Sequence, residues 1–367
     1  MSILIFIIIL LVLVVVHEFG HYIVAKKNGI RVDEFGFGYP PKAYTLFRKW
    51  DTDFTLNWLP FGGFVKIYGE DPNDENTHGP DSERAMVNKP ARVQAAVLVA
   101  GVVFNVLLAW LLLSVGFMTG LPSTVTDDEL GKYVAHPKLT ITQVVKNSPA
   151  SEGGLKPGDV IVDARSESRT LTDFSQEGLI SFVSTSANGE ELVFTVERKG
   201  ETVKEEVLPR EGVVEGKRAI GVSSDLIGTL KLPIHKAFTE GAVQTWHMTK
   251  GTATSLFTLV RDAFLGKADV NTLSGPVGIV GIVGDAADFG FVYLMSFTAL
   301  ISINLAIINL IPFPALDGGR LLFLLIEKIK GSRISPKVSN TLNTAGFFIL
   351  ITLMLVVTYH DIVKLVK

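Results

Sequence analysis

The feature that most constrains this chain is a charged motif within an apolar N-terminal segment. Residues Ile3 to Ala25 are long and apolar enough to cross a bilayer as a helix, yet they contain His17, Glu18 and His21. Each ionisable side chain at bilayer depth costs roughly 2.5 to 3.5 kcal/mol on insertion scales, so three of them so close together need a partner or a purpose. We therefore expect this helix to carry a functional site inside the membrane.

The spacing of these side chains indicates a metal site. Two histidines four positions apart share one helix face, and both imidazoles can then reach a single tetrahedral Zn²⁺. Glu18 directly follows His17, where its carboxylate can take a proton from metal-bound water. The alternative is a chance match, because the HExxH pattern fixes only three positions and is frequent in soluble proteins. The membrane context weakens that alternative, since the motif is costly there.

Composition limits the remaining choices. Hydrophobic residues make up 47% of the 367 residues and charged residues only 19%, which is typical of an integral membrane protein of two or three structural units. The net charge of -3 argues against a nucleic-acid partner. Since the chain has no cysteine, any metal must be held by histidine or carboxylate side chains.

Three further stretches have the character of membrane spans: Val93 to Met118, Phe291 to Ile311 with an apolar continuation to Ile326, and Thr344 to Tyr359. The loop after the first span and the loop after the third are rich in lysine and arginine, which places both in the cytoplasm. Both termini and the long segment between the second and third spans then lie outside. His17 lies about 20 Å along the first helix from Ile3, nearer the cytoplasmic side.

Between the first two spans, Asp51 to Glu70 alternates apolar and polar residues on both sides of Pro60-Phe61-Gly62-Gly63. This pattern predicts a membrane-associated β-hairpin of about residues 51–70 that turns at those four residues. Its free edge could pair with an extended peptide if it lines a cavity. A surface hairpin on the cytoplasmic side is the alternative.

The outer segment changes character between residues 122 and 226, where short β-rich runs alternate with turn signals and indicate a small soluble domain. After it, Ile234 to Leu265 has helical patterning and is expected to form a surface or interfacial helix. We thus divide the chain into an N-terminal membrane region (1–118), a soluble domain (122–226), a linker with amphipathic helices (227–290) and a C-terminal membrane region (291–367).

A catalytic zinc usually has three protein ligands, so a third is needed. Asp317 is the best candidate, because it lies near the cytoplasmic end of the third span and follows Pro312 and Pro314, which break the helix. The alternative role for Asp317 is a cap for a helix that starts near Gly318. Asn309 lies in the same broken region, where its amide could steady a substrate or an oxyanion, or make an interhelical hydrogen bond. The other histidines are isolated, which favours ordinary surface residues.

Taken together, the motifs resemble those of a known family. His17-Glu18-Phe19-Gly20-His21 in the first span, NLIPFPALDGG at residues 309–319, and Phe61-Gly62-Gly63-Phe64 in the predicted hairpin resemble the site-2 protease family of intramembrane zinc metalloproteases. The likeness is to the bacterial RseP-like branch with a single PDZ domain, and Ser274-Gly275-Pro276-Val277-Gly278 belongs to it as well. Residues 148–161 resemble the stretch of bacterial PDZ domains in which a short helix leads into a strand. Val102 departs from the family, which tends to have proline there.

This resemblance implies a polytopic α-helical protein of the cytoplasmic (inner) membrane, with about four transmembrane helices, the β-hairpin and an inserted extracytoplasmic PDZ-like α+β domain. It implies Zn²⁺ as the cofactor, His17, His21 and Asp317 as its ligands, and Glu18 and Asn309 as catalytic residues. Phe61, Gly62, Gly63 and Phe64 are the implied substrate-binding residues. The implied substrates are single-pass membrane proteins, such as anti-sigma factors, and remnant signal peptides. The PDZ-like domain could bind a peptide or act as a size filter.

Two other classes of function remain open from the residues alone. A cluster of histidine and aspartate within the membrane can serve a metal transporter, although that leaves Glu18 and the soluble domain without a task. A membrane scaffold that presents the soluble domain is the other class, although it gives no reason to keep the charged motif.

Overall fold

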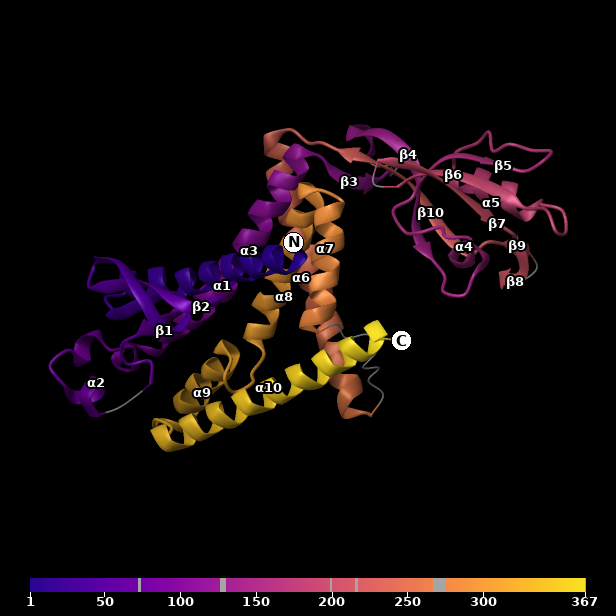
Figure 1. Ribbon diagram of the computed structural model, residues 1–367. Coiled ribbons are helices and arrows are strands. Elements are labelled where there is room, and N and C mark those ends of the chain that lie inside the picture. The colour runs from indigo at the N-terminus through magenta and orange to yellow at the C-terminus, as the bar shows by residue number, and fades with distance from the viewer. Residues whose placement is uncertain (72–73, 126–129, 199, 215–216, 267–274, 367) are drawn as a thin grey trace. The chain divides into compact units, whose positions relative to one another are not determined.

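The computed structural model describes residues 1–367 except 72–73, 126–129, 199, 215–216, 267–274 and 367. The chain forms two compact units, one made of Met1–Val115 and Ala237–Lys367 and the other of Gly116–Lys236. We call the first the membrane unit, because it contains the apolar helices, and the second the β unit (Figure 1).

Four of the described helices are long and apolar enough to cross a membrane, which confirms the expected number of spans. They are α1 (Ser2–Lys27), α3 (Ala91–Thr119), α8 (Phe291–Leu310) and α10 (Pro336–Val366). The helix α10 begins at Pro336, well before the apolar run that predicted it, because proline suits the first turn of a helix and the intervening polar residues are compatible with helix.

The helix of the third span stops at the end of α8, and a new helix, α9 (Asp317–Lys330), begins after a short non-helical segment. The apolar continuation of the third span is therefore a separate helix. Ile311 and Leu316 have extended backbones, and Ala315 between them has a φ of 76°. Prolines 312 and 314 have no N–H for helical hydrogen bonds, which explains why the helix stops here. The break redirects the chain so that α9 starts beside α1.

Helices α1 and α3 approach closely through small residues. A Cβ atom on Gly20 would lie 2.5 Å from the carbonyl oxygen of Ala100, so the contact needs glycine. Small residues of this kind let membrane helices pack backbone to backbone. Next to this contact lies a buried cluster to which both helices contribute, with Tyr22 and Ala25 from α1 and Val97 and Leu98 from α3.

The β-sheet beside α1 differs from the predicted hairpin. Strands β1 (Val32–Lys49) and β2 (Thr52–Ile67) are antiparallel and connect at Trp50 and Asp51, not at residues 60–63. Each strand bends, so that its two ends occupy different positions in the sheet. Phe35 therefore pairs with Phe54 on one side and with Val65 on the other. The two arms of the predicted hairpin therefore lie on opposite sides of residues 32–37 instead of pairing with each other.

The physical reason for this correction is the central position of residues 32–37. They make two hydrogen-bonded ladders, and Val32 and Phe35 are almost fully buried against α1 and α3. Asp33 and Glu34 interrupt the apolar and polar alternation that would mark the segment as a strand. Among the described strands, residues 63–67 pair with β1 on one side only, so they form an edge of the sheet.

Two further long helices, α6 and α7, belong to the membrane unit, which also contains the short helix α2 (Asp74–His78). The helix α6 (Ile234–Phe264) confirms the expected helix, but part of it packs on α3: the Trp110 indole donates to the Phe238 carbonyl, and Gly241 lies against Ser114. The helix α7 (Pro276–Asp288) packs its Val283 with Ile9 and Leu13 of α1. Ser274, the first residue of the motif expected here, lies outside the described residues.

The β unit contains a six-stranded sheet in the order β3-β10-β4-β5-β6-β7 (Figure 1). Its strands are β3 (Leu121–Thr124), β4 (Val134–Val144), β5 (Val160–Arg165), β6 (Leu192–Arg198), β7 (Glu201–Val207) and β10 (Val222–Leu230). A small hairpin, β8 (Arg210–Val214) and β9 (Lys217–Ala219), and the helices α4 (Pro149–Glu152) and α5 (Gln176–Ser184) complete it. The core lies between the sheet and α5, with Ile141, Leu192 and Phe194 fully buried.

A buried ion pair holds one end of this sheet together. Asp159 is 1% exposed and accepts hydrogen bonds from Arg198 on both carboxylate oxygens, each at 2.7 Å. The Lys156 N–H also donates to this carboxylate, and Arg198 donates to the Gly154 carbonyl. Asp159 thereby ties the turn before β5 to the end of β6.

Candidate metal centre

The two histidines of α1 point from one helix face into the protein interior. His17 and His21 are 5% and 6% exposed, and their Nε2 atoms are 3.1 Å apart. The i and i+4 spacing on a helix produces this arrangement directly, as the sequence predicted. Neither imidazole faces bulk solvent, so the two nitrogens are placed to bind a ligand inside the protein and not at its surface.

Asp317 completes a cluster of three donors. Its Oδ2 lies 3.0 Å from His17 Nε2 and 3.4 Å from His21 Nε2. The helix α9 begins at Asp317 itself, and no side chain caps its first turn. The alternative role of Asp317 as a helix cap therefore does not describe this structure, in which the carboxylate reaches across to α1. Among the described residues, these three form the one group with metal-ligand geometry.

The cluster fits a tetrahedral Zn²⁺. Ligand atoms 2.0–2.2 Å from such an ion are about 3.3–3.6 Å from one another, and the three observed separations approach this spacing. The donor set of two imidazole nitrogens and one carboxylate oxygen is one that zinc enzymes use, and it leaves a position open for water or substrate. Gly101 of α3 leaves room for the rings, because a Cβ there would lie 2.5 Å from His21 Nε2 and 2.7 Å from His17 Nε2.

Helix α3 also supports the two rings from behind. The Nδ1 atom of His21 lies 2.8 Å from the Val97 carbonyl oxygen, to which it can donate its proton. The Nδ1 atom of His17 lies 3.3 Å from the side chain of Asn105. Such outer contacts leave each Nε2 free to bind a metal.

Glu18 lies next to the cluster on the same helix, at the point where the sheet meets α1. Its carboxylate accepts a hydrogen bond from the backbone of Val65, in the edge segment 63–67. The same segment approaches α1 at Gly63, where a Cβ would lie 3.6 Å from the side chain of Val15. The candidate base and the sheet edge are therefore direct neighbours.

The other expected site residues lie around this point. Asn309, near the end of α8, has its amide nitrogen 3.5 Å from His17 Nε2, so the structure brings it to the cluster. Gly62 lies near Val14 of α1, and Phe64 packs over Gly36 of β1. The side chain of Phe61 lies outside the described residues.

The sequence did not single out an ion pair close to Asp317. Arg320, three residues further along α9, contacts Glu70 Oε1 at 2.5 Å and Asp71 Oδ1 at 3.3 Å. The pair joins α9 to the chain just after β2, so it helps to fix where Asp317 lies. The available signal was an arginine in the first turn of a helix, just before a run of apolar residues, but its acidic partners are distant in sequence.

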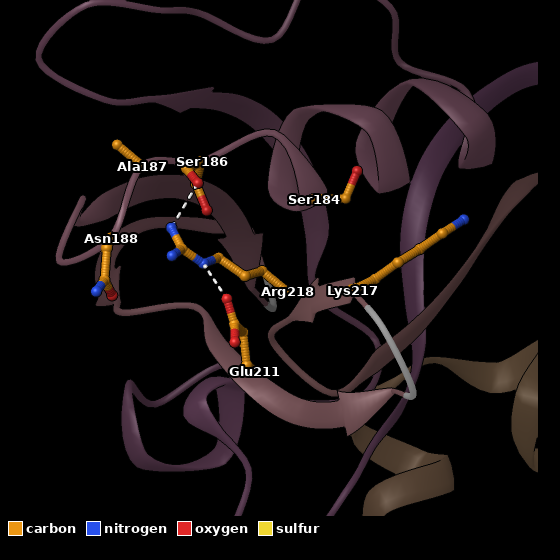
Figure 2. A pocket seen from close by; sticks show the side chains of 7 residues that line it. All are labelled: Ser184, Ser186, Ala187, Asn188, Glu211, Lys217 and Arg218. Atoms are coloured by element: carbon orange, nitrogen blue, oxygen red, sulfur yellow. Dashed lines mark hydrogen bonds and ion pairs between the residues drawn. The ribbon is translucent and has the colours of Figure 1, made fainter.

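A separate cavity lies elsewhere in the described part of the chain. About 740 Å³ in volume, it lies in the β unit between the end of α5 and the hairpin of β8 and β9 (Figure 2). Arg218 occupies one wall, where it donates to the Ser186 carbonyl at 2.7 Å and pairs with Glu211 (Figure 2). The cavity contains no group of metal ligands and is not the metal centre.

Comparison with known proteins decides the family. The sequence model of peptidase family M50, the site-2 protease family, matches residues 5–353 of this chain. The chain belongs to peptidase family M50. As an M50 peptidase it is a zinc metalloendopeptidase, and the four long apolar helices among its described residues make it a membrane protein. The family thus settles the choice between enzyme, transporter and scaffold in favour of the enzyme.

Several curated relatives share nearly the whole length of this M50 peptidase. A provisionally named zinc metalloprotease of Clostridium acetobutylicum is 34% identical and covers 96% of this chain and 94% of its own. The zinc metalloprotease RasP of Geobacillus kaustophilus is 31% identical over 99% of this chain and 98% of its own. The regulator of sigma-W protease RasP of Bacillus subtilis is 31% identical over 98% of each chain.

Proposed function

We propose that this protein cleaves peptide bonds within the membrane-spanning segments of single-pass membrane proteins. The observation that carries the proposal is the buried cluster of His17, His21 and Asp317 on and beside a spanning helix, with Glu18 adjacent. A hydrolytic site at this depth acts on a peptide bond that is itself in the membrane. Anti-sigma factors and remnant signal peptides are the substrate classes that we propose, and the name of the Bacillus subtilis relative supports the first of these.

In the proposed site, His17, His21 and Asp317 would hold a zinc ion. When bound, zinc supplies a Lewis acid that polarises the scissile carbonyl and makes water acidic enough to lose a proton near neutral pH. Glu18 accepts that proton as the oxygen of water bonds to the carbonyl carbon. Glu18 then delivers the proton to the amide nitrogen as the C–N bond breaks, which releases an amine and a carboxylate.

Asn309 and the sheet edge orient the substrate in this proposal. A substrate helix hides its peptide bonds, so it has to unwind before hydrolysis. The unwound strand pairs with the free edge at residues 63–67, next to Glu18, because backbone groups inside a membrane need hydrogen-bond partners. The Asn309 amide donates to the carbonyl oxygen on which negative charge develops.

The β unit is proposed to be a PDZ-like domain of about residues 122–226. The short helix α4 precedes β5, as the resemblance implied, and α5 packs on the sheet. Basic residues around the loops after α1 and α9 support an orientation with these loops in the cytoplasm and the β unit outside. There it contacts the outer part of a substrate, either by binding a peptide or by excluding large domains.

A single experiment tests the catalytic proposal. Wild-type protein and Glu18→Gln are reconstituted with a tagged single-pass substrate, and the zinc content of both proteins is determined. We expect zinc in both proteins, cleavage by wild type alone, and product ends that map to the membrane-spanning segment of the substrate. Cleavage by Glu18→Gln at a rate near that of wild type would exclude Glu18 as the base. Cuts outside the spanning segment would exclude intramembrane proteolysis.

A further inference from the structure

Asn105 of α3 has a buried polar atom that the proposed mechanism does not use. The residue is fully buried, and its Oδ1 has no hydrogen-bond partner within the described parts of the chain. At the other end of the same amide, Nδ2 lies 3.3 Å from Nδ1 of His17. A buried amide oxygen without a partner costs free energy, so this placement calls for an explanation.

The proposed role of His17 decides which end of the amide should face it. With Nε2 of His17 bound to a metal, the proton of the neutral imidazole is on Nδ1, so Nδ1 is a donor. An amide N–H₂ facing a ring N–H sets two donors against each other. Rotating the amide by 180° exchanges its oxygen and nitrogen in the same space, so that Oδ1 accepts from His17 Nδ1 and Nδ2 takes the position that has no partner among the described residues.

The second histidine provides an internal comparison. His21 Nδ1 lies 2.8 Å from the Val97 carbonyl, which can only accept a hydrogen bond. Val97 and Asn105 are both on α3, so one helix supports both rings. The backbone carbonyl of Asn105 separately accepts a hydrogen bond of 2.8 Å from the buried Ser302 hydroxyl of α8, a contact that leaves the side-chain amide free to face His17.

We propose that Asn105 is a positioning residue whose Oδ1 accepts the Nδ1 proton of His17 and so orients Nε2 toward the zinc. This inference rests on the proposed assignment of His17 as a zinc ligand. Outer hydrogen bonds of this kind fix the tautomer and orientation of a ligating imidazole, and their loss typically lowers metal affinity about 10- to 100-fold.

The test compares zinc dissociation constants, measured by chelator competition, for wild type, Asn105→Leu, Asn105→Asp and Ser302→Ala. Leucine has similar size but no acceptor, whereas aspartate keeps an acceptor oxygen in the same place. We expect zinc binding about 10-fold weaker or more in Asn105→Leu and within about threefold of wild type in Asn105→Asp. Ser302→Ala removes the other hydrogen bond of Asn105 and should match wild type. Cleavage of the single-pass substrate should follow the same order.

Two results would overturn the proposal. Zinc binding in Asn105→Leu within threefold of wild type would show that His17 needs no acceptor, and equal losses in Asn105→Leu and Asn105→Asp would show that packing or the amide donor matters instead. If Asn105→Leu does not fold, as judged by gel filtration without zinc, Asn105→Ala replaces it. His17→Ala separates the two levels of the argument: if it binds zinc as wild type does, the ligand assignment itself fails.

Discussion

Position 101 leaves no room for a side chain next to the two histidines. A Cβ on Gly101 would lie 2.5–2.7 Å from ring atoms of His17 and His21, closer than real Cβ atoms come to other atoms. We therefore expect Gly101→Ala to displace the rings and to lower both zinc occupancy and cleavage at least 10-fold, as loss of correct ligand orientation does. Zinc content and substrate cleavage of the purified variant measure the effect.

Gly251→Ala is the matched control for Gly101→Ala. Gly251 also lies within a helix, α6, but a Cβ there has no neighbour within 4 Å. Alanine is better than glycine in a helix by roughly 0.5–1 kcal/mol, so this variant should keep full activity and equal or higher stability. Wild-type zinc binding in Gly101→Ala would show that the rings have more freedom than the structure gives them.

At the scale of residues, the sequence predicted the side chains of the metal cluster but not the residues of α3 that pack around them. His17, Glu18 and His21 are recognisable because their spacing matches a helix, and Asp317 because it is a carboxylate in an apolar region. The structure brings these residues together, while their catalytic roles stay predictions. Gly101 had no such signal, and Asn105, a polar residue in an apolar span, indicated only an interhelical hydrogen bond, because the importance of both arises where α3 crosses α1.

At the scale of elements, local patterns were informative and pairings were not. The break after α8 was predicted by Pro312 and Pro314, which act on their own backbone. The alternating residues 51–70 do lie in a strand, β2, but the prediction that its two halves pair was wrong. Which segments pair in a sheet depends on how the whole sheet packs against the helices. The central segment 32–37 was not recognised as a strand because Asp33 and Glu34 interrupt its alternating pattern.

The buried ion pair of the β unit gives a prediction at this scale. Asp159→Ala removes two charge-assisted hydrogen bonds from the largely buried Arg198, which keeps Glu205 as a partner, and each such bond is worth roughly 1.5–3 kcal/mol. The exposed pair of Lys138 and Glu197 is the control, since surface pairs are worth about 0–1 kcal/mol. Hydrogen exchange of the sheet core in the full-length protein measures both: Asp159→Ala should raise exchange strongly and Glu197→Ala hardly. Equal effects would contradict the structural role of Asp159.

At the scale of the whole molecule, the absence of native cysteine permits a direct test of orientation. Ser168 lies in the β unit and Ser332 follows α9, and both are exposed. With the basic loops inside, a membrane-impermeant maleimide should label Ser168→Cys in cells whose outer barriers are opened, and Ser332→Cys only after the cytoplasmic membrane is also permeabilised. The reverse pattern would invert the proposed topology.

The number of membrane spans could be predicted from the sequence because a bilayer demands long apolar helices whatever their partners. The position of α6 could not. Its polar residues predicted a surface or interfacial helix, yet Phe238 and Gly241 pack on α3, and only the shapes of the facing side chains show this.

The central claim is that His17, His21 and Asp317 together hold one catalytic zinc, and the most direct measurement is the zinc content per chain. It should be measured by mass spectrometry of the metal in purified wild type and in His17→Ala, His21→Ala and Asp317→Ala. We predict one zinc per wild-type chain and almost none in each variant, with each variant still folded in detergent. Zinc at the wild-type level in these variants would contradict the claim, because the metal would then be bound elsewhere.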